Sequence, residues 1–256
     1  MAGKDKDNHS KTLKFLDSRD IQAVGIDVDN TLFHTSEYYI NAISKLGIKL
    51  APKINNNRDP KKISKEISNV FLLEYEKDGR KPRLIDERYI SGLKGYLGYD
   101  VPEDMQRYVI DFFKDFYLKS PEPFQSASQL IKTLYNCGRK IVLHSHAQEE
   151  WTRIKVNLLE KLTGYTLPYL STPINVTKDS KSWLRAFDIV KTDIVNTLVI
   201  GDNLEADIRP PIEAGSKYLI WMNRYKSCPP EDLNLQDDVE LIIVNDISDI
   251  LKNLKR

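Results

Sequence analysis

The sequence predicts an α/β protein, in which a Rossmann-like parallel sheet carries an inserted helical cap. Short and almost wholly apolar runs alternate with segments of helical periodicity through the second half of the chain. Such runs are typical of strands covered on both faces, and their alternation with helices indicates a parallel sheet. A long stretch without a strong strand signal separates the first apolar run from the second, which indicates an insertion.

Five segments are expected to be strands because they are rich in aliphatic and β-branched residues. They span residues 23–27, 140–143, 197–200, 218–222 and 240–244. Apolar residues recur three and four positions apart in the segments expected to be helices. These span residues 126–136, 149–162, 182–190 and 204–214. Pro210 and Pro211 interrupt the last one, so its helix is expected to start late, with Pro211 in its first turn.

The apolar residues between about 33 and 120 recur at helical spacing, and this stretch is far longer than a normal crossover. We therefore expect a core made of residues 21–33 and 121–256 and a helical cap over 34–120. The first residues lack an apolar period, so we expect 1–20 to be a mobile segment. An insertion at the end of a strand lies where α/β proteins bind ligands.

Composition narrows the class of protein. The chain has 256 residues with 38 basic and 37 acidic side chains, which gives a formal net charge of +1. We expect no nucleic-acid partner, because neutralising phosphate charge needs a surplus of basic residues. Two distant cysteines, Cys137 and Cys228, exclude a disulfide scaffold and a four-cysteine zinc site. The N-terminus is polar and the chain has no long apolar run, so no membrane association and a cytoplasmic location are expected.

Two aspartates, Asp27 and Asp29, follow the first apolar run. At the frayed end of a strand, two carboxylates at this spacing can converge on one ligand. One carboxylate can attack phosphorus, and a second can pass a proton to the leaving group. Ordinary turn chemistry explains Asp-Asn-Thr equally well when this segment is taken alone.

A second apolar run ends in Gly201-Asp202, and Asp207 follows five residues later. An aspartate that caps a helix is the alternative for a single site of this kind. Two carboxylate-tipped strands in one sheet favour a metal site, and Mg²⁺ usually takes only one or two carboxylates from the protein.

Ser145 follows a third apolar run just before a helix, where a hydroxyl and helix N-terminal amides can bind an anion. Lys178 precedes another helix and can neutralise phosphate charge. Singly, each has an ordinary alternative, since serine caps helices and lysine is usually solvated.

Taken in order, Asp27-x-Asp29-x-Thr31, Ser145, Lys178 and Gly201-Asp202-x₄-Asp207 resemble the motifs of the haloacid dehalogenase superfamily of phosphohydrolases. The resemblance covers about residues 21–33 and 121–251. It implies that Asp27 attacks phosphorus and that Asp29 protonates the leaving group and then activates water.

The resemblance also implies the ligands. Mg²⁺ would be held by Asp27, the Asp29 backbone carbonyl and Asp202, with Asp207 supporting the site. Ser145, His146 and Lys178 would bind the transferring phosphoryl group, and Lys181 is the alternative lysine. His146 departs from the family pattern, which commonly has Asn or Gly there.

Asp29 argues for phosphate rather than haloacid chemistry, since dehalogenases of the superfamily lack the second aspartate. The insertion resembles the α-helical cap of members that act on small phosphate esters. The sequence therefore predicts an Mg²⁺-dependent phosphatase for a small phosphorylated substrate. A phosphomutase and a non-catalytic phosphate-binding or partner-binding module stay as alternatives. A zinc site built from His34, His144 and His146 is a weaker interpretation, and the oligomeric state is not readable from the sequence.

Overall fold

The computed structural model describes residues 2–54, 58–77, 87–224, 235 and 237–255, with side chains from residue 9 onward. The chain divides into two compact units. The first combines Met1–His34 with Pro123–Arg256, and the second is Thr35–Glu122.

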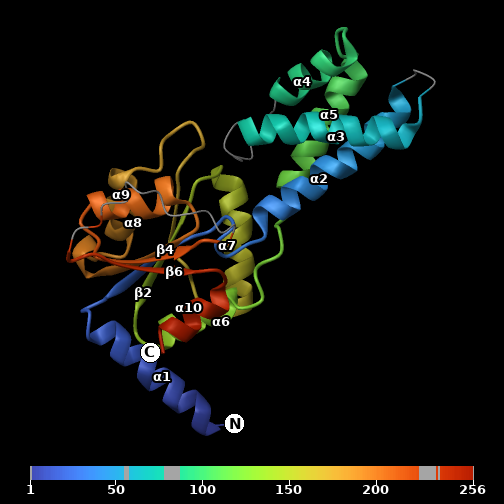
Figure 1. Cartoon of the computed structure of the whole chain (residues 1–256). Helices are drawn as coiled ribbons and strands as arrows, with labels where there is room; N and C mark the ends of the chain where they lie inside the picture. The colour runs from blue at the N-terminus through green and yellow to red at the C-terminus, as the bar shows by residue number, and fades with distance from the viewer. Residues whose placement is uncertain (1, 55–57, 78–86, 225–234, 236, 256) are drawn as a thin grey trace. The chain divides into compact units, whose positions relative to one another are not determined.

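A six-stranded parallel sheet forms the centre of the first unit (Figure 1). Its strand order is β3-β2-β1-β4-β5-β6. The strands are β1 (Ala23–Asp27), β2 (Lys140–Ser145), β3 (Tyr169–Ser171), β4 (Thr197–Gly201), β5 (Tyr218–Met222) and β6 (Glu240–Val244). β2 and β3 lie on one side of β1, and β4, β5 and β6 lie on the other side. The carboxyl ends of β1, β2 and β4 therefore lie at the switch point where open α/β sheets bind ligands.

Helices cover both faces of this sheet, which explains why the central strands β1 and β4 are buried along their whole length. Val24 and Ile26 of β1 pack with helices α1, α6, α7 and α10, whereas Ala23 packs on the opposite face with α8. These helices are α1 (Ala2–Asp17), α6 (Ala127–Asn136), α7 (Glu149–Thr163), α8 (Ser180–Ile189), α9 (Arg209–Glu213) and α10 (Ile247–Asn253). A Cβ on Gly25 would lie 2.7 Å from the Phe187 ring, so a glycine lets α8 approach β1 closely.

All secondary-structure elements described in the second unit are helices. Its helices are α2 (Thr35–Leu50), η1 (Ala51–Lys53), α3 (Pro60–Lys77), α4 (Glu87–Leu97) and α5 (Glu103–Tyr117). Buried aromatic side chains fill its centre, and the hydroxyls of Tyr39 and Tyr89 are hydrogen bonded at 2.6 Å. The phenol rings thus supply apolar packing while their polar ends satisfy each other.

Three local features were not expected in full. No helix was expected before the first strand, yet α1 spans Ala2–Asp17 and buries Thr12 and Leu16. The three-residue strand β3 was not predicted, since so short a segment has too few residues to display a strand pattern. The helix expected within 204–214 starts late, as the prolines predicted, with Pro211 in the first turn of α9. The residues before it form a π-helical turn, η3 (Leu204–Ile208), which was not expected.

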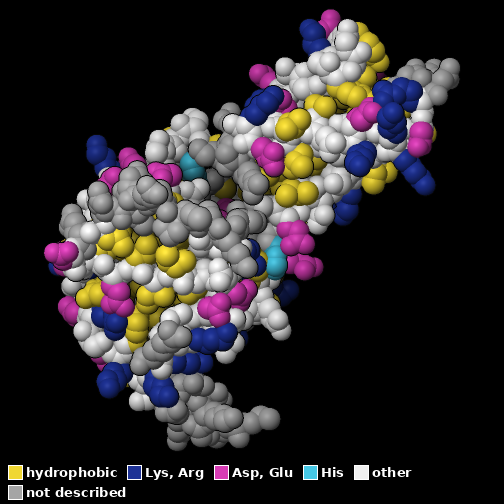
Figure 2. Space-filling view, in the orientation of Figure 1, with side chains coloured by type: hydrophobic (Ala, Val, Ile, Leu, Met, Phe, Trp, Pro, Cys, Tyr) yellow, Lys and Arg dark blue, Asp and Glu magenta, His cyan; other side chains and the backbone are white. Residues whose placement is uncertain are grey.

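The face drawn in Figure 2 is mixed in charge. Acidic and basic side chains are intermixed on the visible face of the molecule (Figure 2), in keeping with the net charge of +1. None of the helices in the described residues has the length and apolar character that crossing a membrane requires.

Candidate active site

The carboxyl edge of the sheet gathers most of the predicted site residues. Asp27 ends β1, Ser145 ends β2 and Asp202 directly follows β4. β1 pairs in parallel with both β2 and β4, and Asp27 lies beside His144 in the register. Residues that are more than a hundred positions apart in the sequence therefore meet at one edge.

Lys178 lies at the centre of this site. Its Nζ donates hydrogen bonds to Asp27 Oδ1 at 2.7 Å, to Asp207 Oδ1 at 2.6 Å and to the His144 carbonyl at 2.7 Å. The side chain is 1% exposed. Burial by itself would lower the pKa of Lys178, but the Asp207 and Asp27 carboxylates raise it above the ordinary lysine value. The lysine is therefore a permanent cation between two carboxylates.

Three carboxylates form a cluster that suits a metal ion. One oxygen from each of Asp27, Asp202 and Asp207 lies within 4.8 Å of the others. Asp27 Oδ2 is buried and has no hydrogen-bond partner among the residues that the structure describes. Burial and the neighbouring charges of Asp207 and Asp29 raise the pKa of Asp27 to about 7, although Lys178 acts in the opposite direction. Burial and the charges of Asp27 and Asp207 also raise the pKa of Asp202 well above its ordinary value.

The ligand chemistry of this cluster suits Mg²⁺. A hard divalent cation binds carboxylate oxygens, and Asp27, Asp202 and Asp207 each present one oxygen toward the others. A bound cation would also offset the repulsion that raises both pKa values. The carboxylate of Asp207, expected only to support the metal, belongs to the cluster, whereas that of Asp29 does not. The expected contribution of the Asp29 backbone carbonyl stays a prediction.

The local fold explains the position of Asp207. Its Oδ2 accepts a hydrogen bond of 3.0 Å from the backbone N–H of Asn203, across the π-helical turn η3. A Cβ on Gly201 would lie 2.2 Å from the Asp207 Cβ. Only a glycine at the end of β4 leaves room for this carboxylate. π-Helical turns are rare and are frequently found at functional sites.

Asp29 has a different environment from the cluster. Ser145 Oγ donates a hydrogen bond of 2.8 Å to its Oδ2, and Lys155 Nζ donates one of 2.5 Å to its Oδ1. Its side chain is 19% exposed, whereas that of Lys155 is fully buried. Sequence reasoning missed Lys155, although its place on the apolar face of a predicted helix was a signal that could have found it.

Comparison with solved structures identifies the fold. A haloacid dehalogenase-like hydrolase from Xanthomonas campestris is 15% identical with a TM-score of 0.60, covering 92% of this chain and 96% of its own. A HAD phosphatase from Thermococcus onnurineus is 16% identical with a TM-score of 0.58, covering 91% and 98%. A HAD-hydrolase from Bacillus subtilis bound to magnesium is 16% identical with a TM-score of 0.59, covering 92% and 99%. The chain has the haloacid dehalogenase-like fold.

The likeness at this level of identity concerns the fold, and it confirms the α/β class and the family resemblance expected from the motifs. A dehalogenase and a β-phosphoglucomutase are also similar, with TM-scores of 0.60 and 0.59. A scan against protein-family models found no match. A search of curated proteins likewise found no match.

The histidines do not form a shared metal site within this haloacid dehalogenase-like fold. His144 Nε2 lies 3.0 Å from Thr172 Oγ1, and His146 Nε2 lies 2.8 Å from the Val176 carbonyl. Burial lowers the pKa of His144 well below its ordinary value, so this imidazole is neutral. Among the described residues, the only cluster with metal-site geometry is the aspartate cluster.

The two candidate lysines differ in placement. Lys178 is buried among the carboxylates, whereas Lys181 is exposed on α8. The geometry therefore favours Lys178 as the phosphoryl-binding lysine. His146 contacts the backbone carbonyl of Val176. Its expected role in binding the phosphoryl group stays a prediction.

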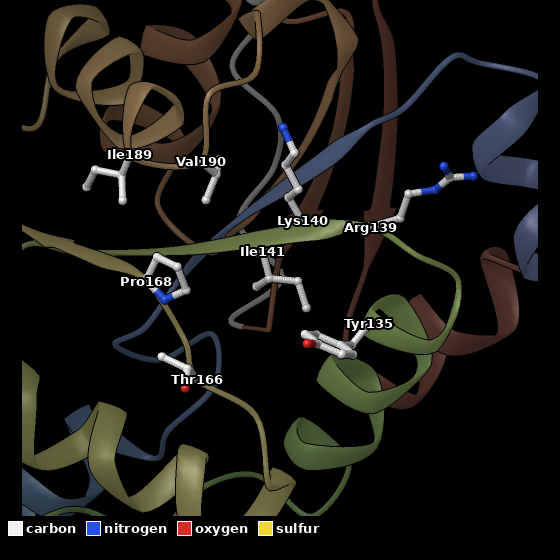
Figure 3. Close-up of a pocket in the computed structure, with 8 residues that line it drawn as sticks. All are labelled: Tyr135, Arg139, Lys140, Ile141, Thr166, Pro168, Ile189 and Val190. Carbon is white, nitrogen blue, oxygen red and sulfur yellow. The ribbon is translucent and has the colours of Figure 1, made fainter.

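A separate hollow of about 300 Å³ lies in the first unit. It is lined by Tyr135, Arg139, Lys140, Ile141, Thr166, Pro168, Ile189 and Val190 (Figure 3). Lys140 begins β2, so this hollow is at the amino edge of the sheet. It is therefore distinct from the carboxylate site, which is at the carboxyl edge.

Proposed function

We propose that this protein is an Mg²⁺-dependent phosphatase that hydrolyses a small phosphate monoester through an aspartyl-phosphate on Asp27. The observation that carries the proposal is the buried Oδ2 of Asp27, which has no hydrogen-bond partner in the described part of the chain and lies within the carboxylate cluster beside Lys178. A nucleophile needs such a free oxygen, and transfer of a charged phosphoryl group needs nearby positive charge.

In the first half-reaction, Asp27 forms a bond to phosphorus while the bond from phosphorus to the ester oxygen breaks. The electron pair goes to the leaving oxygen, which takes a proton from Asp29. In the second, Asp29 takes a proton from water as the water oxygen attacks phosphorus, releasing inorganic phosphate and free Asp27. One residue serves as acid and then as base.

The remaining residues bind and orient the phosphoryl group. Lys178 contacts Asp27, the proposed nucleophile. Ser145 contacts Asp29, the proposed acid and base. His146 would complete the phosphoryl-binding set. Asp27, Asp202 and the backbone carbonyl of Asp29 would hold Mg²⁺, and the Asp207 carboxylate lies within the same cluster. The ion would supply positive charge to the transferring group.

A phosphomutase is the second candidate because a β-phosphoglucomutase is among the similar structures. It shares the first half-reaction but passes the phosphoryl group to a sugar instead of water. Dehalogenases are also similar in fold, yet Asp29 favours a leaving group that needs a proton, as an ester oxygen does. A bisphosphate requirement for turnover would favour the mutase.

The test is phosphate release from a panel of sugar phosphates, nucleotides, phosphoglycolate and phosphoproteins, with Mg²⁺ and with a chelator. Asp27→Asn should keep the fold and abolish release, and acid quenching of the intact enzyme should trap phosphate on the peptide that contains Asp27. Asp188→Asn, at an exposed position of α8, is the matched control and should leave the rate unchanged. Near-normal turnover by Asp27→Asn would refute the covalent mechanism, and binding without release by the intact protein would favour the non-catalytic module.

A further inference from the structure

Lys155 is a buried cation that the proposed chemistry has not yet used. It lies on α7, on the face that also buries Trp151, Thr152 and Leu159, and it is 0% exposed. Its Nζ is 2.5 Å from Asp29 Oδ1 and 4.1 Å from the centroid of the Trp151 ring. Burying an ammonium group is costly unless a charged partner compensates it. Asp29 is the carboxylate that provides this compensation.

Two of the described side chains donate to Asp29, one to each carboxylate oxygen. Oδ1 accepts from Lys155, and Oδ2 accepts from the hydroxyl of Ser145. An ammonium group has no lone pair and cannot accept a proton, whereas a hydroxyl can both donate and accept. Oδ1 therefore faces a donor that cannot take a proton from it, whereas Oδ2 faces a hydroxyl that can accept as well as donate. We take Oδ2 as the oxygen that can exchange a proton with the substrate.

We propose that Lys155 is a positioning residue that orients Asp29 and makes Oδ2 the oxygen that gives and takes the proton. The inference rests on the proposed phosphatase function. When the leaving bond breaks, the proton moves from Oδ2 to the ester oxygen, and the carboxylate that remains is adjacent to the Lys155 ammonium group. When water attacks, Oδ2 takes the proton back.

The need for such an anchor follows from the position of Ser145. This serine contacts Asp29 in the structure, yet the proposed function also uses its hydroxyl to bind the phosphoryl group. A hydroxyl has one proton to donate, so donation to a phosphoryl oxygen ends its donation to Oδ2. Lys155 comes from a different element, α7, and continues to hold Oδ1. Asp29 thus keeps its orientation while its reactive oxygen is released.

The test compares esters that differ in their need for a proton. An activated aryl phosphate leaves as a stable anion, whereas an alkyl phosphate needs a proton on its leaving oxygen. Lys155→Met removes the charge while keeping apolar contact with Trp151. We expect the rate constant for phosphorylation of Asp27, measured from single-turnover release of the alcohol or phenol, to fall on the order of 10²- to 10⁴-fold for the alkyl ester, the usual contribution of a general acid, and much less for the aryl ester. Hydrolysis of the aspartyl-phosphate, which is common to both esters, should slow equally for the two. Lys161→Met, at an exposed position of the same helix, should change neither rate.

A double variant separates positioning from general structural damage. In an Asp29→Asn background, Lys155→Met should slow the alkyl ester no further, because the two residues act as one unit. Thermal unfolding with and without Mg²⁺ monitors the fold, and Lys155→Gln is the second variant if Lys155→Met unfolds.

The possible outcomes of these experiments distinguish failure of the Lys155 role from failure of the proposed function. Equal slowing of the phosphorylation step with both esters, or further slowing in the Asp29→Asn background, overturns the role of Lys155 while leaving the phosphatase proposal intact. Failure of both Lys155 variants to fold assigns the lysine a structural role and also overturns the inference. If the wild-type protein releases phosphate from neither ester, the proposed function fails, and this inference fails with it.

Discussion

The ammonium group of Lys178 lies 2.7 Å from Asp27 Oδ1, although the two residues are 151 positions apart in the sequence. Both side chains are buried, and the same Nζ also contacts Asp207. This contact brings the proposed nucleophile, the proposed phosphoryl-binding lysine and the aspartate cluster together. Its energetic consequences can be measured without knowing the substrate.

Replacing Lys178 by methionine should destabilise the protein and abolish activity. Asp27 and Asp207 would lose their shared cation, and breaking a buried ion pair from one side costs about 3–5 kcal/mol. The free energy of unfolding, measured by denaturant titration, checks the size of the loss. Lys181→Met is the matched control and should change that free energy by no more than about 0.5 kcal/mol. A larger activity loss in the control would favour Lys181 as the phosphoryl-binding lysine.

Mg²⁺ should raise the thermal stability of the protein, because a ligand that binds only the native state stabilises it by about 2.7 kcal/mol at a hundred times its dissociation constant. Asp202→Ala should remove most of this Mg²⁺ effect together with activity. The variant without metal should unfold no earlier than the wild-type protein, since one of three neighbouring carboxylates is gone. Thermal unfolding with Mg²⁺, Zn²⁺ or a chelator makes the comparison. Stabilisation by Zn²⁺ but not Mg²⁺ would contradict the assigned metal.

The metal-free protein should lose stability as pH rises from about 4 to about 7. The pKa of Asp27 is raised from 3.8 to about 7 in the folded protein, mainly by burial and then by Asp207. Between those values the native state binds more protons than the unfolded state, so the free energy of unfolding falls with increasing pH. Urea titrations in chelator at several pH values should show a shallower dependence for Asp27→Asn. An identical slope in the variant would assign the dependence to other groups.

Gly201→Ala should disrupt the site through Asp207. The added Cβ would lie 2.2 Å from the Asp207 Cβ, so the π-helical turn must shift, at a cost of about 1–3 kcal/mol typical of overpacking. Mg²⁺ stabilisation and activity should fall together. Gly95→Ala is the control, since its Cβ would meet nothing within 4 Å and helix propensity favours alanine. Normal Mg²⁺ stabilisation in Gly201→Ala would show that metal binding does not depend on the close approach of Gly201 to Asp207.

Removing the helical unit should leave a foldable core with altered selectivity. Phe33 and Pro123 form an antiparallel bridge, and the Phe124 N–H donates to the Leu32 carbonyl at 2.9 Å, so a short linker can replace Thr35–Glu122. We expect this variant to hydrolyse a small aryl phosphate but to lose its preference among physiological esters. Circular dichroism verifies the fold, and kcat/KM over an ester panel measures preference. Full selectivity in a folded deletion variant would show that the helical unit is not the specificity element.

The expected strands at 23–27, 218–222 and 240–244 match β1, β5 and β6 residue for residue, because their runs of apolar residues leave a continuous signal in the sequence. Burial on both faces explains this signal for β1, whereas β6 is an edge strand in which only Val244 is buried. The carboxylates at the ends of β1 and β4 were found for a related reason. Strand ends are local features, and parallel strands bring their carboxyl ends to one edge of the sheet. The α/β class and the candidate catalytic aspartates Asp27 and Asp29 were thus readable from the sequence.

The tertiary structure alone decided which side chains contact one another at that edge. It placed Lys178 between Asp27 and Asp207, and it brought Lys155 of α7 against Asp29. It also grouped the Asp207 carboxylate with those of Asp27 and Asp202. These contacts depend on the orientation of helices packed over the sheet and on close approaches such as that at Gly201. A lysine in a sequence is usually a solvated charge, and only burial beside a particular carboxylate reveals a partner, because the pairing energy arises from distance and desolvation.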